Sequence, residues 1–557
     1  MLKKNKTSLI ITAGAALLLI AGSIGAYLLI VSRRPAQDVP IGANIIPQNA
    51  MMTISLSTNN GEWEKLRQYG TPESKIALDR VLGDLRDRLL TANGYGYQQD
   101  IEPWVGKEIT IAFLQNYTTP PTTSSPQQSV AIVMPIDNPL KAKELLAQPK
   151  PINQGKMVER KYKGIQIAEL QGVPDRKLSV AALASEYLVV TTDPKAIDRI
   201  IDTYKGEPSI TSTPGFIESL EPIKTNQPFA QLYFNIPVSA TYASNNSSRP
   251  ISAENLEQLK TQGLSAAVTL ESDGIAFKSI AWLKNNIETK LAIENNAETM
   301  LTRLPNNTLM AINGGNLQRL WQDYSQGSQA NPIAPFPPET LRSAIKSSTG
   351  MDWDRDFINW MKGPFSVSLI PATTIQNSPG KFGAGFVFMV ETNDFKAADR
   401  SLKNLDEIMK NKKFKVEEAK VSGQPVIKWT TPFGGVSITR GWINKNVAFM
   451  TVGAPIAEAI LPMPKSPLLG SEFFEKAMRS QLKPNNGSFF IDVDKAFNPK
   501  NLAIPELPPN QKVWVDAIKS IGFTTAVTSD RTTRYDAFIQ LKKVNQSNPP
   551  VKVSPKL

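Results

Sequence analysis

Short apolar runs separated by polar turns recur along most of this chain, and a helical spacing of apolar residues replaces them in only a few places. The pattern predicts strands in the first half at residues 51–56, 109–114, 130–136, 161–170, 178–184, 187–192, 229–236, 264–270 and 275–283. It predicts helices at residues 62–69, 73–90, 137–146, 193–204 and 216–220. Because the steps between strands are mostly short, we expect a largely antiparallel α+β fold.

The clearest internal feature of the sequence is a motif that occurs twice. Residues 100–114 read DIEPWVGKEITIAFL, and residues 356–370 read DFINWMKGPFSVSLI. Each copy has an acidic residue, an apolar turn, Trp, Gly and then a strand. Flanking segments repeat in the same order at a nearly constant shift of about 258 residues. The sequence therefore predicts one α+β module that is duplicated in tandem.

Four residues of the repeated motif form its structural signature, namely Trp104, Gly106, Trp360 and Gly363. A Trp beside a Gly-bearing turn at the head of a strand is usually a large core side chain. We therefore expect these four residues to support the fold, and we assign them no catalytic, cofactor-binding or metal-binding role.

Near the amino terminus, Ser8–Val31 contains 24 residues without a charge. Such a run is long enough to cross a hydrocarbon core of about 30 Å, so it predicts a transmembrane helix. A cleavable signal peptide is the alternative, but the apolar run is long for one, and Arg33 and Arg34 follow where small residues would be expected. The flanking charges favour a cytoplasmic amino terminus, with the rest of the chain in the periplasm or a lumen.

The predicted fold class is two tandem copies of a largely antiparallel sheet covered by helices, plus one N-terminal transmembrane helix. The predicted organisation is a cytoplasmic N-terminus (1–7), a transmembrane helix (8–31), a tether (32–46), a first α+β module (47–290), a second α+β module (291–543) and a disordered tail (544–557).

Composition excludes several kinds of chemistry. The chain of 557 residues has no Cys and no His, which removes disulfides, thiolate nucleophiles, Cys or His metal sites and Ser-His or Cys-His catalysis. The net charge of +12 is uneven: residues 1–46 carry +4, residues 47–290 carry −1 and residues 291–557 carry +9. Because the first module is neutral and aromatic residues are rare among the basic runs, we expect no nucleic-acid partner. No cofactor is predicted.

Two Ser-x-x-Lys pairs have a spacing that would place both side chains on one helical face: Ser343 with Lys346, and Ser480 with Lys483. The companion motifs of penicillin-interacting enzymes are absent from the sequence, and Ser and Lys are abundant. Chance spacing is therefore the better explanation for both pairs.

Two charged clusters could also carry chemistry. Asp352, Asp354 and Asp356 alternate like the first ligands of a calcium loop, but the required later Gly and Glu are missing, so an acidic helix start is favoured. The densest run of basic residues would either lie on a solvated surface or contact lipid headgroups, and the solvated surface is favoured. It consists of Lys410, Lys412, Lys413, Lys415 and Lys420.

The segments 47–56 and 100–113, together with the predicted anchor and the repeat, resemble a cyanobacterial family of membrane-anchored proteins known as the domain of unknown function DUF3352. The resemblance implies a single-pass protein of the plasma or thylakoid membrane whose long region is periplasmic or lumenal. It implies no activity, and no catalytic residue carries over.

These observations favour a non-enzymatic binding or scaffolding protein that contacts the bilayer through its N-terminal helix. Its partner would be another protein or an envelope polymer, and the crevice between the two modules is the candidate surface. Two alternatives stay open: a carboxylate-dependent or Ser-Lys hydrolase of the cell envelope, and a carrier of lipids or other hydrophobic molecules.

Overall fold

The structure is a computed structural model. It describes residues 39–89, 95–115, 129–147, 155–173, 177–246, 250–288, 290–328, 336–372, 383–432, 437–501 and 507–543. The predicted segments 1–7 and 8–31 and the tail 544–557 lie outside the described residues, as does the tether 32–46 except for its last eight residues.

Within the described residues, twenty strands form one antiparallel sheet. In the first half they are β1 (Met52–Ser57), β2 (Glu108–Leu114), β3 (Ser129–Pro135), β4 (Lys156–Tyr162), β5 (Ile165–Gln171), β6 (Ser179–Leu183), β7 (Tyr187–Thr191), β8 (Ala230–Asn235), β9 (Thr261–Leu270) and β10 (Gly274–Leu283). In the second half they are β11 (Met310–Gly314), β12 (Phe365–Pro371), β13 (Ala384–Glu391), β14 (Lys415–Val421), β15 (Gln424–Thr430), β16 (Ser437–Ile443), β17 (Val447–Gly453), β18 (Gly487–Asp492), β19 (Ile518–Val527) and β20 (Thr532–Leu541).

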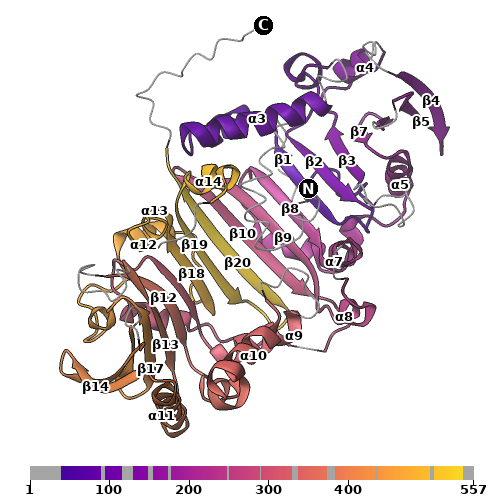
Figure 1. The fold of residues 1–557 in the computed structure, drawn as a ribbon. Helices are drawn as coiled ribbons and strands as arrows, with labels where there is room; N and C mark the ends of the chain where they lie inside the picture. Colours follow the sequence, from indigo (N-terminus) through magenta and orange to yellow (C-terminus); the bar gives the residue numbers. More distant parts are fainter. Residues whose placement is uncertain are drawn as a thin grey trace.

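Helices lie on the faces and ends of this sheet (Figure 1). Those of the first half are α2 (Asn60–Leu66), α3 (Pro72–Leu89), α4 (Pro139–Ala147), α5 (Pro194–Tyr204), α6 (Phe216–Leu220), α7 (Ile236–Asn245) and α8 (Ala253–Glu257). Those of the second half are α9 (Leu317–Gly327), α10 (Pro338–Thr349), α11 (Phe395–Asn411), α12 (Glu472–Ala477), α13 (Val493–Ala496) and α14 (Pro509–Val515).

The two halves have the same strand order and meet at their last strands. Across the sheet the first half runs β4-β5-β6-β7-β3-β2-β1-β8-β9-β10, and the second half continues β20-β19-β18-β11-β12-β13-β17-β16-β15-β14. Lys278 of β10 lies opposite Asp536 of β20. Because these residues hold equivalent places in two ten-residue strands, the approximate two-fold axis of the duplication passes between them.

The predicted fold class is wrong in its arrangement of sheets. The two copies do not form separate sheets, because β10 and β20 pair along nine residues and join them into one sheet, which Figure 1 shows at the centre of the molecule. None of the helices in the described part of the chain is both long and apolar enough to cross a bilayer, and the predicted transmembrane helix 8–31 lies outside that part.

One predicted strand, 161–170, is two strands in the structure. The chain turns between β4 and β5 at Lys163 and Gly164, whose φ angles are 45° and 86°. Two successive positive φ angles define the tight hairpin turn that suits twisted strands. The sequence has Lys-Gly here and lacks the Asn-Gly or Asp-Gly pair that is typical of this turn, so the pattern across it predicts one continuous strand.

One face of the central sheet is covered in the first half and largely open in the second. Leu78 and Leu82 of α3 belong to the same buried cluster as Ile54 of β1, which is 8% exposed. At the equivalent place on β11, Ile312 is 39% exposed, and Phe386 of the same face is 43% exposed. An aliphatic side chain therefore contributes very differently to stability at two equivalent positions.

We expect Ile54→Ala to lower the free energy of unfolding by about 2–4 kcal/mol, because the substitution leaves a cavity under α3. The matched variant Ile312→Ala should cost under about 1 kcal/mol, since much of its side chain already meets water. Urea denaturation of both variants measures the difference. Equal losses would show that something covers Ile312 as fully as α3 covers Ile54.

A partly buried carboxyl in the first half gives stability a pH dependence. Glu108 of β2 accepts a hydrogen bond from the backbone N–H of Ile41 at 2.7 Å. Burial raises the pKa of Glu108 to about 7, and the hydrogen bonds to Ile41 and Ser55 oppose that shift only in part. The folded state therefore holds this proton to a higher pH than the unfolded chain does.

The sign follows from linkage: between the unfolded pKa of about 4.5 and the folded pKa of about 7, the folded state binds more protons, so stability falls as pH rises. The penalty is complete above pH 7 and is absent well below pH 4.5. We expect Glu108→Gln to be more stable than the unmodified protein at pH 8, by up to about 3 kcal/mol. Urea midpoints at pH 5 and pH 8 test this, and an unchanged difference between the two proteins would refute it.

Candidate binding site between the two halves

The two signature tryptophans occupy equivalent buried positions. Each follows a short π-helix, at Tyr97–Ile101 in the first half and at Trp353–Phe357 in the second. The indole Nε1 of Trp104 donates to the carbonyl of Asp100 at 2.6 Å, and that of Trp360 donates to the carbonyl of Asp356 at 3.0 Å. Both rings are at least 97% buried, so neither presents a surface to a ligand.

The two signature glycines lie where the chain passes close to a neighbouring strand end. A Cβ on Gly106 would stand 2.9 Å from the Cγ of Pro135, and one on Gly363 would stand 2.6 Å from the carbonyl oxygen of Glu391. The backbone N–H groups of both glycines donate to the carbonyls of these same two residues. These contacts indicate that the glycines permit close packing.

The structure does not bring the Ser-x-x-Lys pairs into a common arrangement. Ser343 and Lys346 are exposed on α10. Ser480 and Lys483 lie beyond the end of α12, outside any helix, so the spacing that would align them on one helical face does not apply. The sequence contains no His or Cys that could activate either serine.

The three alternating aspartates bond to groups of the protein itself, and Asp356 accepts from the backbone N–H of Asp352 and from Arg355 Nε, each at 2.8 Å. Asp352 caps the π-helix by accepting from the N–H of Arg355 at 2.9 Å. Asp354 accepts from Arg342 Nε at 2.6 Å, and the hydrogen bond to this guanidinium lowers the pKa of Asp354. Within the described residues, no group of three or more acidic side chains is placed to hold a metal ion.

The lysine run is spread over the end of α11 and over β14. Lys410 pairs with Glu407 at 2.7 Å, and Lys415 pairs with Glu417 at 2.6 Å. All five side chains of the run are exposed or half-buried. This arrangement is that of a solvated surface, and a contact with lipid headgroups stays a prediction.

A pocket of about 390 Å³ lies where the two halves meet. Its floor includes Ile280 and Trp282 of β10, and one wall is formed by Ser219 of α6 and by Pro222. The opposite wall comes from the second half, with Arg531 in the turn between β19 and β20. Because both halves line it, this pocket exists only when they are joined.

Two arginines line the pocket, and only one of them is paired with a described carboxylate. The Arg531 guanidinium donates to the carbonyl of Ile287 at 3.0 Å and to that of Lys284, and no carboxylate in the described part of the chain pairs with it. Arg534 Nη2 contacts the two carboxylate oxygens of Asp536 at 2.8 and 2.9 Å, and its Nη1 donates to the Pro222 carbonyl at 2.7 Å.

Two further features concern the Arg534 and Asp536 pair. The Arg534 Nε–H is buried and has no hydrogen-bond acceptor among the described residues. Burial raises the pKa of Asp536, while Arg534 acts in the opposite direction. The pocket therefore offers one unneutralised guanidinium and one unused buried donor beside an apolar floor.

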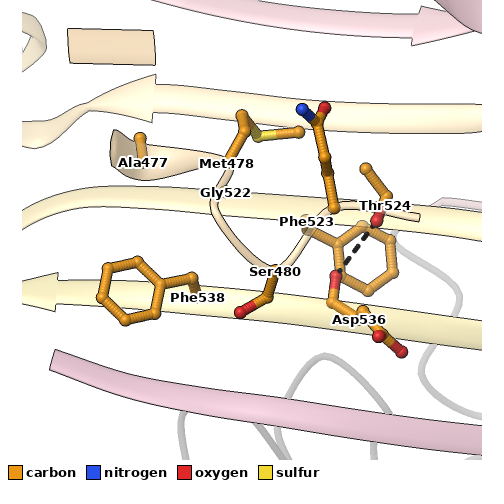
Figure 2. Close-up of a pocket in the computed structure, with 9 residues that line it drawn as sticks. Ala477, Met478, Ser480, Gly522, Phe523, Thr524, Asp536 and Phe538 are labelled. Atoms are coloured by element: carbon orange, nitrogen blue, oxygen red, sulfur yellow. Dashed lines mark hydrogen bonds between the residues drawn. The ribbon is translucent and has the colours of Figure 1, made fainter. Parts of the chain in front are cut away.

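The equivalent place in the second half, whose lining residues are drawn in Figure 2, is not an open pocket. There α12 packs directly on β19, because a Cβ at Gly522 would stand only 2.1 Å from the carbonyl oxygen of Ala477. The depression beside Met478 and Phe538 has no room for a water molecule. In the first half the equivalent residue is Ser265, whose hydroxyl lies 2.8 Å from that of Ser219. Ser265 therefore has a side chain that contacts α6 where Gly522 has none that could fit under α12.

Sequence reasoning named the crevice between the halves but none of the residues that line it. Ser219, Trp282 and Arg531 are separated by long stretches of sequence, and no motif links them. The sequence does show Ser265 at the place equivalent to Gly522, but the meaning of that difference depends on the helix packed above each residue.

Fold and pocket together define a class of protein: a duplicated α+β chain that joins two halves through one antiparallel sheet and forms a pocket at the junction. The chain belongs to the family described as "Protein of unknown function (DUF3352)", whose model matches residues 11–541. This match confirms the family that the sequence resembles. The cyanobacterial source stays a prediction.

Comparison with solved structures adds no functional information. No curated protein matches the chain. Among solved structures, crystal form IV of TP0453 is 11% identical with a TM-score of 0.24, covering 45% of this chain and 81% of that chain. Crystal form I of TP0453 is 12% identical with a TM-score of 0.25, covering 46% of this chain and 82% of that chain. Likeness at this TM-score carries no argument.

Proposed function

We propose that this protein is a non-enzymatic binding protein whose ligand site is the pocket between the two halves. The observation that carries the proposal is the shared lining, in which Trp282 comes from the first half and Arg531 from the second. A concave site of several hundred cubic ångströms with an apolar floor and a few polar groups is typical of ligand recognition.

Two earlier expectations accompany this proposal. A periplasmic or lumenal location, and a protein or envelope-polymer partner, stay predictions that the described residues leave untested. The hydrolase and the carrier of hydrophobic molecules also stay open as alternatives, and each would give a different result in the experiment below.

A thermal-shift screen of the full-length protein against small molecules tests the proposal. A ligand of the pocket should raise the melting temperature of the unmodified protein, because binding to the folded state stabilises it. It should have little effect on Thr532→Trp, in which a large ring enters the pocket from β20. Thr533→Trp is the matched control, because its side chain points to the opposite face of the same strand.

Three outcomes would overturn the proposal. Ligands that stabilise Thr532→Trp as well as the unmodified protein would place the site elsewhere. Chemical turnover of a bound compound would favour the hydrolase, and selective stabilisation by long-chain hydrocarbons without a polar group would favour the carrier.

A further inference from the structure

The floor of the pocket is a rigid apolar surface. The ring of Trp282 is held by a hydrogen bond from its Nε1 to the Pro214 carbonyl at 2.9 Å, and it stacks near Tyr233 with the ring centroids 6.3 Å apart. Ile280 lies two residues before it on the same face of β10. A fixed aromatic ring of this kind can hold the apolar part of a ligand at little cost in conformational entropy.

The wall contributed by the second half is polar and carries a positive charge. A guanidinium has five N–H donors, and the two contacts of Arg531 to the carbonyls of Ile287 and Lys284 leave others available. These two carbonyls also fix the direction of the side chain. An anionic oxygen that reaches Arg531 would meet a positioned donor whose charge no described carboxylate neutralises.

The rim contains one group that opposes an anion. Glu218 of α6 lines the mouth of the pocket, but its side chain is exposed, so water and salt screen its charge. Arg534 also lines the pocket, but it is already paired with Asp536, and its Nε–H is buried. The charges of the residues that line the pocket therefore favour a ligand with a single negative group at Arg531.

We propose that the pocket binds a small organic anion in which a carboxylate or a phosphate contacts Arg531 and an apolar or aromatic body lies against Trp282. This inference rests on the proposed function and adds the chemical class of the ligand. The two anionic groups share the recognition chemistry, and the experiment distinguishes them.

Binding to the full-length protein is measured by isothermal titration calorimetry with four probes: 3-phenylpropionate, phenyl phosphate, 3-phenylpropan-1-ol and inorganic phosphate. We expect at least one of the two aromatic anions to bind, and the tighter of the two identifies the preferred anionic group. The alcohol and inorganic phosphate should each bind at least about tenfold more weakly, since each lacks one half of the recognised structure. Affinity for the aromatic anion should also fall as salt is raised.

Two substitutions at Arg531 test the assigned residue. Arg531→Gln should lower the affinity for the aromatic anion by about tenfold or more and leave the affinity for the alcohol unchanged. Arg531→Lys keeps the charge and should retain more of the anion affinity, which separates charge recognition from a loss of folding. The matched control is Arg479→Gln, because Arg479 lies beside the closed counterpart in the second half and pairs with Asp273.

The outcomes separate this inference from the proposed function. The alcohol and the aromatic anions could bind equally well, with binding abolished by Thr532→Trp but unaffected by Arg531→Gln. That result would refute recognition of an anionic group and would leave the pocket as a binding site. If inorganic phosphate binds as tightly as phenyl phosphate, the apolar body of the ligand does not contribute to binding, and that part of the proposal is wrong. Binding of any probe that Thr532→Trp leaves unchanged would overturn both proposals.

Discussion

Asp406→Ala should lower the free energy of unfolding by about 3–5 kcal/mol, because it leaves a buried arginine without its counter-charge. The Asp406 carboxylate on α11 is buried and accepts hydrogen bonds from both Nε and Nη2 of Arg440, with Nε at 2.7 Å. It also accepts from the indole Nε1 of Trp429 at 2.8 Å. This one carboxylate therefore connects α11 to β15 and β16.

A second aspartate on the same helix is the control. Asp399 pairs with Lys403 at 2.8 Å, but the lysine side chain is 70% exposed. Ion pairs in water contribute little, so Asp399→Ala should cost under about 1 kcal/mol. Chemical denaturation of the two variants gives the comparison. Similar small losses would mean that Arg440 finds water or another acceptor when Asp406 is removed.

The local elements were the part of the fold that the sequence predicted well. The strand expected at 51–56 is β1, Met52–Ser57, and the helix expected at 216–220 is α6 with the same bounds. Alternation of apolar residues on a half-buried strand is a local property, so it is visible without knowledge of the partner strand. The family was also identified correctly, because its motif consists of neighbouring residues.

The junction could not be predicted in the same way. Each half ends in a similar hairpin, and nothing in either hairpin states that its last strand pairs with the equivalent strand of the other half. The opposite charges of Lys278 and Asp536 are compatible with the pairing, but two charges far apart in sequence are weak evidence. Strand pairing over such a separation depends on the whole surface of both halves.

The candidate site depends on still smaller differences. Ser265 bonds to Ser219 of α6, whereas a Cβ at the equivalent Gly522 would stand 2.1 Å from the carbonyl oxygen of Ala477, so the close packing of α12 requires glycine there. The sequence shows this substitution, but its effect needs the position of Ala477 above the glycine. Arg440 and Asp406 illustrate the same limit, since neither belonged to any predicted cluster.

The repeated motif predicts a large loss of folding stability when either of its tryptophans is replaced. Trp104→Ala and Trp360→Ala should each lower the free energy of unfolding by about 3–5 kcal/mol, since each removes a large buried side chain. The two rings lie in separate buried clusters, one in each half. Their effects should therefore add in the double variant to within about 0.5 kcal/mol, as is usual for distant sites.

Trp104→Phe and Trp360→Phe are the matched controls. Each keeps an aromatic ring but removes the indole donor, leaving the carbonyl of Asp100 or Asp356 without that hydrogen bond. A loss of about 1–3 kcal/mol is expected for each, smaller than for alanine. Urea denaturation followed by circular dichroism measures all five variants. A large loss at one tryptophan and almost none at the other would show that the two halves, despite the same strand order, do not depend on the motif in the same way.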